Sequence, residues 1–120
     1  MSSLFPGQPR PLCRLTDIPD GGAKGFPAPP GGFTGLFAVR RGETVAVYVN
    51  ACPHIGTPLD WAKDRFLSAD GMMIVCATHG AQFRVEDGVC VSGPCRGDRL
   101  ERVVTQVRDG TIWVPENAGL

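Results

Sequence analysis

The chain has 120 residues, enough for one domain with a single hydrophobic core. Its 12 Lys and Arg residues balance its 12 Asp and Glu residues, so charge gives no reason to expect nucleic acid or an anionic membrane as a partner. No apolar run approaches the length of a transmembrane helix, and the N-terminus lacks the pattern of a secretory signal, so we expect a soluble cytoplasmic protein.

The fold class follows from the spacing of turn residues. Short, valine-rich apolar segments are separated by 16 glycines and 11 prolines spread along the whole chain, and no stretch keeps a helical period for three turns. This pattern predicts an all-β domain over residues 10–115. We expect a flexible N-terminal segment at 1–9 and a frayed tail at 116–120.

In chain order, the first predicted strand covers residues 12–18 and ends at Pro19, and residues 20–32 form a loop or a loosely paired edge. We expect four hairpins, each with two strands flanking a glycine-containing turn: 33–50 around Gly42, 66–76 around Asp70-Gly71, 81–91 around Glu86-Asp87-Gly88, and 101–115 around Asp109-Gly110. The imperfect alternation of Val103, Val104 and Val107 predicts a twist or bulge, and residues 59–66 could form one short helical turn at most.

Two loops rich in cysteine, histidine, glycine or proline interrupt the β pattern. The loop "ACPHIGTPL" (51–59) holds Cys52 and His54, and the loop "CATHGA" (76–81) holds Cys76 and His79. Two thiolates and two imidazoles can bind a structural zinc ion or a 2Fe–2S cluster with two cysteines on one iron and two histidines on the other. Zinc fingers usually pair like with like locally, whereas each loop here carries one residue of each kind, which favours the cluster.

The motif C-x-H followed by C-x-x-H resembles the signature of the Rieske 2Fe–2S family, and "SGPCRG" (92–97) resembles the loop whose Gly-Pro covers the cluster in that family. The resemblance extends over most of residues 10–115. It implies a Rieske-type antiparallel β-sandwich with a small cluster-binding subdomain formed by the two Cys/His loops. The patterns most similar to this one are those of small Rieske ferredoxins, of dioxygenase ferredoxin components and of nitrite reductase small subunits.

The resemblance also implies the site. Cys52, His54, Cys76 and His79 would bind the 2Fe–2S cluster, with the histidines at the exposed tip and the cysteines deeper. We expect Gly56 and Gly80, each close after a ligand histidine, to allow tight turns or a positive φ.

A Rieske oxygenase also needs a mononuclear iron held by two histidines and a carboxylate, but this chain has only two histidines and the cluster would use both. No Gly-x-Gly-x-x-Gly fingerprint supports a nicotinamide or flavin site. We therefore expect a non-enzymatic electron carrier that accepts one electron from a reductase and delivers it to an oxygenase-type terminal enzyme. The alternatives are a permanent small subunit of a larger reductase and a non-redox interaction module with structural zinc.

The resemblance also predicts a low reduction potential. High-potential Rieske proteins carry a disulfide between the cluster loops, and a serine and a tyrosine whose hydroxyls donate to cluster and cysteine sulfurs. The matching positions are Thr57 and Thr78, which cannot form the disulfide, and Ala81 and Phe83, which have no hydroxyl. We expect a potential on the order of −150 mV.

The remaining candidate residues have ordinary structural explanations. Cys13, Cys90 and Cys95 are predicted to be small buried hydrophobes. For Cys95, a spare thiol is favoured over a redox or repair thiol paired with Cys90, since cytoplasmic disulfides are rare. Trp113 is expected in the core, and Trp61 is expected to pack under the segment of residues 60–66. Surface charge explains Arg84, Arg96 and Arg99 better than a docking role at the cluster tip does.

Overall fold

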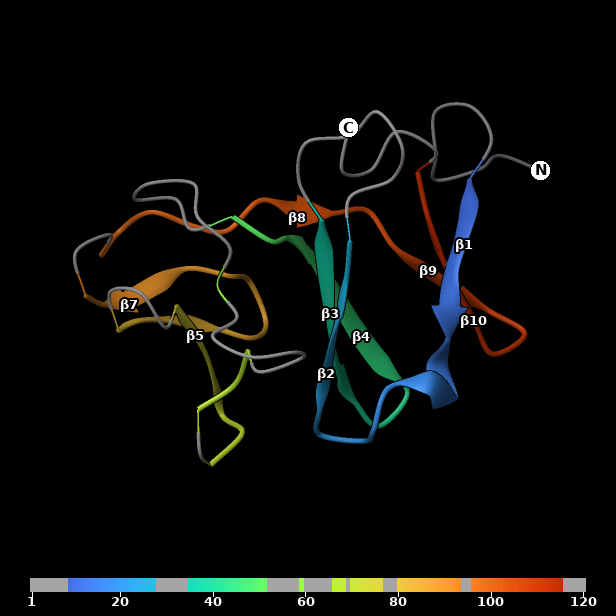
Figure 1. The fold of residues 1–120 in the computed structure, drawn as a ribbon, viewed down its shortest axis with the longest axis horizontal. Helices are drawn as coiled ribbons and strands as arrows, with labels where there is room; N and C mark the ends of the chain where they lie inside the picture. The colour runs from blue at the N-terminus through green and yellow to red at the C-terminus, as the bar shows by residue number, and fades with distance from the viewer. Residues whose placement is uncertain are drawn as a thin grey trace.

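The structure, a computed structural model, describes residues 9–27, 35–51, 59, 66–68, 70–76, 80–93 and 96–115. Those residues form ten strands and one short 3-10 helix, η1 (Leu15–Asp17) (Figure 1). The strands are β1 (Arg10–Arg14), β2 (Ala23–Phe26), β3 (Leu36–Arg41), β4 (Thr44–Val49), β5 (Met73–Cys76), β6 (Ala81–Arg84), β7 (Cys90–Ser92), β8 (Arg102–Val103), β9 (Gln106–Arg108) and β10 (Thr111–Val114). The all-β prediction is confirmed. In the described part of the chain, no helix has the length and apolar character needed to cross a membrane.

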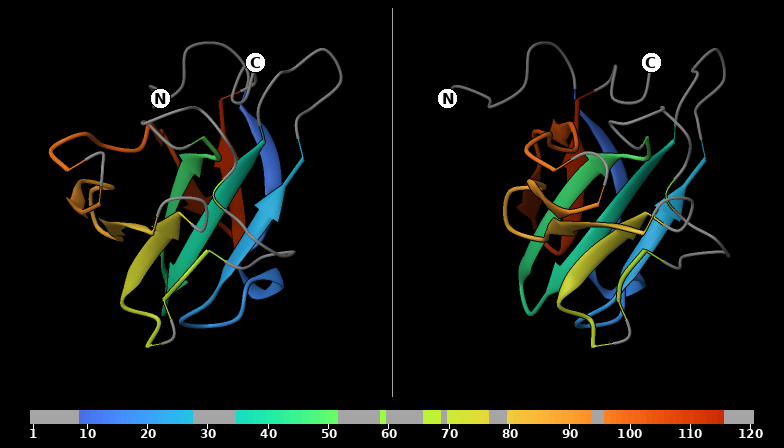
Figure 2. Two further views of the ribbon diagram at one scale, coloured as in Figure 1. Left: turned by 60° about the vertical axis from the view of Figure 1, so that its left-hand side comes forward. Right: turned by 90° about the vertical axis from the view of Figure 1, so that its left-hand side faces the viewer.

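The strands form three antiparallel sheets, in the orders β1-β10-β9, β2-β3-β4-β8 and β5-β6-β7. Figure 2 shows the green strands β3 and β4 between the yellow strand β5 on one side and the blue and red strands β1 and β10 on the other. The four-stranded sheet is therefore the middle layer of the molecule.

The central hairpin of β3 and β4 is buried on both faces because its side chains alternate between two cores. Phe37, Val39, Ala46 and Tyr48 point into a core shared with β5, β6 and β7. Leu36, Ala38, Val45 and Val47 point into a second core shared with η1 and β10. A run of apolar residues without polar alternation is what a strand covered on both sides requires.

Two of the predicted hairpins turn as expected. β3 and β4 are joined by the two-residue turn Gly42-Glu43. Gly42 has φ 62, the positive φ that is expected for glycine at the first position of such a turn. β9 and β10 are joined by Asp109-Gly110, at φ 53 and 76, the positive pair typical of a type I′ turn.

The other two hairpins have longer loops than their sequence motifs suggested. The amide of Ser68 donates to the carbonyl of Met73 at 2.8 Å, so four residues separate the two arms instead of the Asp70-Gly71 pair alone. The amide of Arg84 likewise donates to the carbonyl of Val89 at 3.0 Å, and the loop between them closes at Gly88, with φ 73. The predicted hairpins exist, but the two-residue turn at Asp70-Gly71 was wrong.

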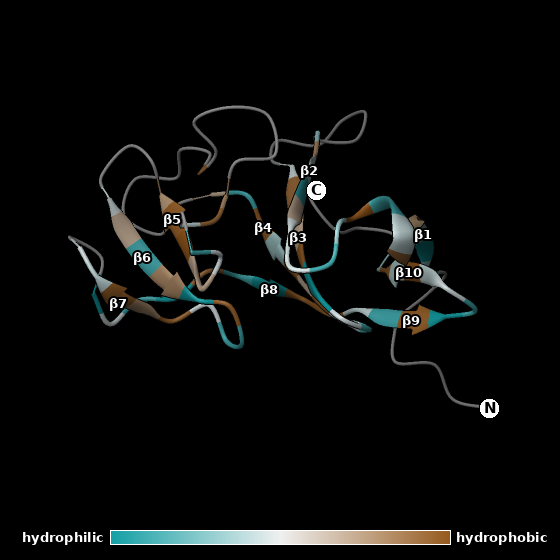
Figure 3. Ribbon diagram, turned by 90° about the horizontal axis from the view of Figure 1, so that it is seen from below, coloured by the Kyte–Doolittle hydropathy of each residue, from teal (hydrophilic) through white to brown (hydrophobic). Residues whose placement is uncertain are grey.

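Two strand predictions need correction. The predicted strand 12–18 ends at Arg14, because the Asp17 carboxylate accepts the Arg14 amide at 2.9 Å and stabilises the 3-10 turn of η1. The predicted strand after Glu101 is not one bulged strand. β8 pairs with β4 in the middle sheet, whereas β9 pairs with β10 in the outer sheet, so the chain changes sheet at residues 104–105 (Figure 3).

Among residues 20–32, the structure describes β2 as an edge strand paired with β3 in four consecutive registered positions, which confirms the paired-edge alternative. The predicted termini at 1–9 and 116–120 and the predicted helical turn at 59–66 fall almost wholly outside the described residues, and the predicted domain limits stay predictions.

Candidate metal centre

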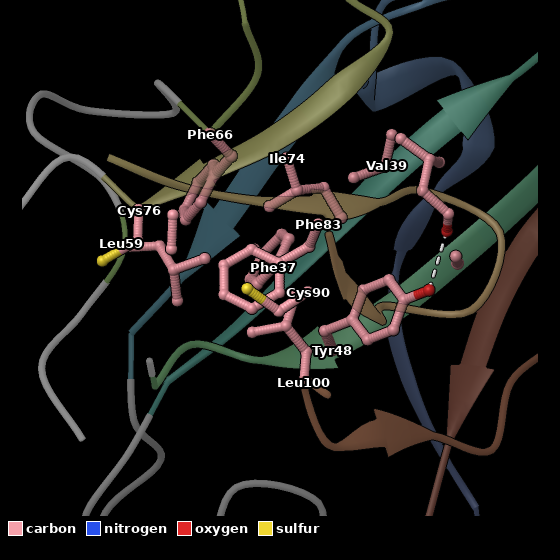
Figure 4. Close-up of a cluster of buried hydrophobic side chains, with 13 residues drawn as sticks. Phe37, Val39, Tyr48, Leu59, Phe66, Ile74, Cys76, Phe83, Cys90 and Leu100 are labelled. Carbon is pink, nitrogen blue, oxygen red and sulfur yellow. Dashed lines mark hydrogen bonds between the residues drawn. The ribbon is translucent and has the colours of Figure 1, made fainter. Parts of the chain in front are cut away.

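Cys76 is the one predicted ligand that the structure describes, and it ends β5. Along this strand Ile74 and Cys76 face the core, and the Cys76 side chain is fully buried. It belongs to the same core cluster as Leu59 and Phe66, and Figure 4 shows these three at one end of that cluster. The Cys76 thiol therefore packs against apolar side chains, and the rest of the second Cys/His loop follows it directly in the sequence.

The second Cys/His loop is a tight connection between paired strand ends. Cys76 and Ala81 are directly opposite each other in the ladder, so only four residues, 77–80, join β5 to β6. The amide of Gly80 donates to the carbonyl of Cys76 at 2.8 Å, and Gly80 has φ 68. The positive φ predicted for the residue after His79 is confirmed, and glycine adopts it without steric cost.

The first Cys/His loop is described at its two ends. The amide of Ala51 donates to the carbonyl of Val49 at 2.9 Å, where the chain leaves β4. Leu59 is fully buried, and its amide donates to Oδ1 of Asn50 at 2.8 Å. Cys52, His54, Gly56 and Thr57 lie between these ends, outside the described residues, as do Thr78 and His79 in the second loop.

The roles of Asn50 and Leu59 were not predicted from the sequence. Asn50 was expected at the end of a strand, where asparagine is a common side-chain partner for nearby backbone amides. That preference was the only available signal, and it does not identify Leu59 as the partner.

The third loop packs directly against the second. Gly93 has φ 102, and a methyl group on it would lie 2.7 Å from Cα of Ala81, so only glycine fits at this distance. Beyond Pro94 and Cys95, which are outside the described residues, the chain returns to β7: the amide of Cys90 donates to the carbonyl of Asp98 at 2.8 Å. The third loop is thus fixed at Gly93 beside Ala81, the last residue of the second Cys/His loop.

Ala81 and Phe83 are both fully buried, on β6. They occupy the positions at which the sequence lacks hydroxyl groups, and the structure places them in the apolar core that contains Cys76.

Arg84 is paired within the molecule. Its guanidinium forms an ion pair with the Asp87 carboxylate, and its Nε donates to Asp87 Oδ1 at 3.1 Å. The hydrogen bond from Arg84 is the main reason that the pKa of Asp87 is lowered. Arg96 and Arg99 are exposed. The ion pair with Asp87 therefore explains Arg84 as a surface charge, with no need for a docking partner protein.

The other thiols and the tryptophans lie outside the two Cys/His loops. Cys90 is buried, as predicted, and its Sγ lies 3.2 Å from the Ser92 carbonyl oxygen. Cys13 on β1 is half-buried, and burial, followed by the charge of Asp17, raises the pKa of its thiol to about 11. Trp113 is only half-buried, so its placement in the core was wrong: in β10 its neighbours Ile112 and Val114 face the core instead. Trp61 and Cys95 are outside the described residues.

No group of three or more metal-ligating side chains gathers among the residues that the structure describes, which include only one of the four predicted ligands. The fit to a metal centre rests on the donor set and on the places where the two loops leave the fold. A buried thiol joined to a four-residue connection that also contains a histidine suits a fixed centre with one deep and one shallow ligand per loop.

Comparison with known proteins identifies the family of the chain. The family model described as "Rieske [2Fe-2S] domain" matches residues 9–111, a range that contains both Cys/His loops and the third loop. No curated protein matches the chain.

Similar solved structures share the fold. One comes from a complex of reduced oxygenase and oxidized ferredoxin in carbazole 1,9a-dioxygenase, with 24% identity, a TM-score of 0.70, and coverage of 88% of this chain and 91% of that one. Another is the ferredoxin of carbazole 1,9a-dioxygenase from Nocardioides aromaticivorans IC177, with 24% identity, a TM-score of 0.72, and coverage of 91% and 98%. A third, from a reduced complex between oxygenase and ferredoxin in carbazole 1,9a-dioxygenase, has 20% identity and a TM-score of 0.73, and the match covers 94% of this chain but 30% of that one.

Proposed function

The chain belongs to the Rieske [2Fe-2S] domain family, whose cofactor is a 2Fe–2S cluster, and on that premise we propose that it is an electron carrier that binds the cluster through Cys52, His54, Cys76 and His79. The observation that carries the proposal is the family match over 9–111, because that range contains every histidine of the chain and both C-x-H and C-x-x-H motifs. When bound, such a cluster takes up and releases one electron at a time.

The described residues support this assignment by their chemistry. Cys76 supplies a sulfur ligand from a buried position, where Leu59, Phe66 and Phe83 exclude water behind it. Gly80 turns the chain sharply enough to return it to β6 within four residues. Electron exchange then takes place on the side of the two histidines, since the cysteine side is covered by the core.

The carrier role follows from what remains after the cluster ligands are assigned. No histidine is left for a mononuclear iron site, so the chain itself cannot be a Rieske oxygenase. Two of the structures similar to this chain come from complexes of a ferredoxin with the oxygenase of carbazole 1,9a-dioxygenase, which supports an oxygenase-type enzyme as acceptor. A reductase as donor and a cytoplasmic location complete the proposal.

The test is the metal content of the purified full-length protein and of three variants. We expect two irons and two acid-labile sulfides per chain and a red-brown colour. Cys76→Ser should lose the cluster, because a hydroxyl is a poor ligand for iron at this site. Cys13→Ser and Cys90→Ser are matched controls, since they change thiols outside the two loops, and both should keep it. A colourless protein with one zinc ion, or a Cys76→Ser variant with the native visible spectrum, would contradict the assignment.

The fixed-subunit alternative differs in association and not in the cluster. Gel filtration of a native extract, followed by detection of the chain, should place it at the size of a free small protein. Elution only with a much larger reductase would favour the permanent subunit instead.

A further inference from the structure

Asn50 follows β4 and forms hydrogen bonds through both its backbone and its side chain. Its amide donates to the carbonyl of Gly35 at 2.9 Å, and its Oδ1 accepts from the amide of Leu59 at 2.8 Å. Because a backbone N–H can only donate, the carbonyl end of the side chain must face Leu59. The side chain thus connects two residues that are nine positions apart and that bracket the first Cys/His loop.

Both residues at the base of this loop are anchored in the fold. On one side, the amides of Val49 and Ala51 donate to the carbonyls of Glu101 and Val49, both at 2.9 Å, so the chain is held by consecutive hydrogen bonds as it leaves β4. On the other side, the Leu59 side chain is fully buried in the core cluster that also contains Cys76 (Figure 4). The Asn50 side chain joins these two anchored ends.

We propose that Asn50 is a positioning residue of the metal centre, whose side-chain oxygen closes the base of the first Cys/His loop and thereby keeps Cys52 and His54 in place for the cluster. This inference rests on the proposed function. A loop whose ends are already tied together has less conformational entropy to lose when its residues become ligands. It also keeps a released ligand near the metal, which favours recapture over loss of the cluster.

The required chemistry is an acceptor oxygen at the end of a two-carbon side chain. Alanine removes the acceptor. Aspartate keeps an oxygen in the same place and adds a negative charge. A comparison of Asn50→Ala with Asn50→Asp therefore separates the closing of the loop from the polarity of the site.

A matched control removes the same kind of bond elsewhere. The Asp20 Oδ1 accepts the amide of Gly42 at 2.7 Å, again a side-chain oxygen holding a distant backbone amide. This bond connects the segment after η1 to the turn between β3 and β4, and neither contains a Cys/His loop. Asp20→Ala reports what such a loss does to the fold alone.

The experiment uses the full chain isolated with its cluster. We would measure the rate at which the visible absorbance disappears in excess EDTA, the midpoint potential by protein-film voltammetry, and the melting temperature. Asn50→Ala should lose the cluster about two- to tenfold faster than the wild type, the range expected for one lost hydrogen bond. Asp20→Ala should lower the melting temperature but lose its cluster at the wild-type rate.

Asn50→Asp should retain the cluster at close to the wild-type rate and show a lower midpoint potential, because the added negative charge opposes reduction. If Asn50→Ala does not fold, the aspartate variant decides: a retained cluster supports the acceptor role, and a lost cluster overturns it. Wild-type loss rates in a folded Asn50→Ala protein, or equal acceleration in Asp20→Ala, would also overturn it. Failure of the proposed function is distinguishable, because the wild type would then contain no iron–sulfur cluster at all.

Discussion

The residues around Cys76 are apolar, and this has an electrochemical consequence. Ala81 and Phe83 are fully buried and offer no hydroxyl to a sulfur ligand. Hydrogen bonds to such sulfurs stabilise the additional negative charge of a reduced cluster, so their absence favours the oxidised state. We predict a midpoint potential near the lower end of the Rieske range, about −150 mV, by voltammetry on the wild type. The double variant Ala81→Ser, Phe83→Tyr should have a higher potential. A wild-type midpoint above zero would refute this explanation.

The folding stability of the double variant serves as an internal control for its potential, because Phe83 is fully buried and a hydroxyl placed there has no water to bind. A buried hydroxyl without a partner costs about 1–3 kcal/mol of folding free energy. A raised potential with unchanged stability indicates that the new hydroxyls have found sulfur acceptors. Lost stability with an unchanged potential indicates that they have not.

Cys13 is predicted to be an unreactive thiol. Its pKa of about 11, raised mainly by burial, leaves little thiolate at pH 8, and the thiolate is the nucleophile. Iodoacetamide should label Cys13 in the folded protein at least about tenfold more slowly than in the urea-unfolded chain, as followed by mass spectrometry. The folded state also binds more protons than the unfolded state between pH 9 and about 11, so folding stability should fall as the pH rises through that window. Equal labelling rates in the two states would contradict the shift.

At the scale of elements, the third loop is predicted to depend on a glycine. A methyl group on Gly93 would lie 2.7 Å from Cα of Ala81, whereas one on Gly97 would meet no atom of the described residues within 4 Å, although both glycines have positive φ, at 102 and 96. Gly97→Ala should therefore cost backbone strain alone, on the order of 1 kcal/mol. Gly93→Ala should cost about 1–3 kcal/mol more, because Ala81 must move. Chemical denaturation of both variants gives the comparison, and equal losses would show that the third loop is not packed against Ala81 in solution.

What the sequence could predict at this scale depended on whether the cause was local and had one outcome. The Asp109-Gly110 turn was predictable because two adjacent residues with positive φ determine it. The 3-10 turn at Leu15–Asp17 was missed although its cause is also local, because the Arg14 amide can donate either to a paired strand or to the Asp17 carboxylate, and the sequence does not decide between the two. The separation of β8 from β9 was missed for a different reason: β8 pairs with β4, which is distant in sequence, while β9 pairs with the neighbouring strand β10, and the valines of this segment keep no clear period.

The same reasoning applies to the candidate site. The ligand residues could be proposed from sequence because their types and spacing are a local motif. Asn50 could not be connected to Leu59, because their hydrogen bond depends on where the chain returns after an eight-residue interval. Gly93 could be placed in a loop, but its contact with Ala81 joins two strands whose ends meet only in the folded sheet.

At the scale of the molecule, Tyr48 joins the middle sheet to the hairpin of β6 and β7. Its hydroxyl donates to the carbonyl of Val85 at 2.7 Å within the core, as Figure 4 shows by a dashed line. Tyr48→Phe should leave that buried carbonyl without its donor and lower the free energy of unfolding by about 1–3 kcal/mol in urea titrations. The visible spectrum should not change, because Tyr48 packs beneath Gly88 at the far end of the hairpin from Cys76 and Ala81. A variant as stable as the wild type would mean that water replaces the lost donor.

The double-sided burial of β3 and β4 limits how this fold can exchange segments with its relatives. The ring of Phe37, in the middle layer, stacks on Phe66 with centroids 4.5 Å apart. The strands around the second Cys/His loop therefore pack against side chains of the β3–β4 hairpin. A chimera that imports only residues 66–100 from a related protein would pack foreign side chains against the native β3–β4 hairpin, and their volumes would not match the side chains of that hairpin. A segment exchange that keeps the packing intact must include the β3–β4 hairpin. The alternate side chains of that hairpin, which belong to the core shared with η1 and β10, would then be exchanged as well.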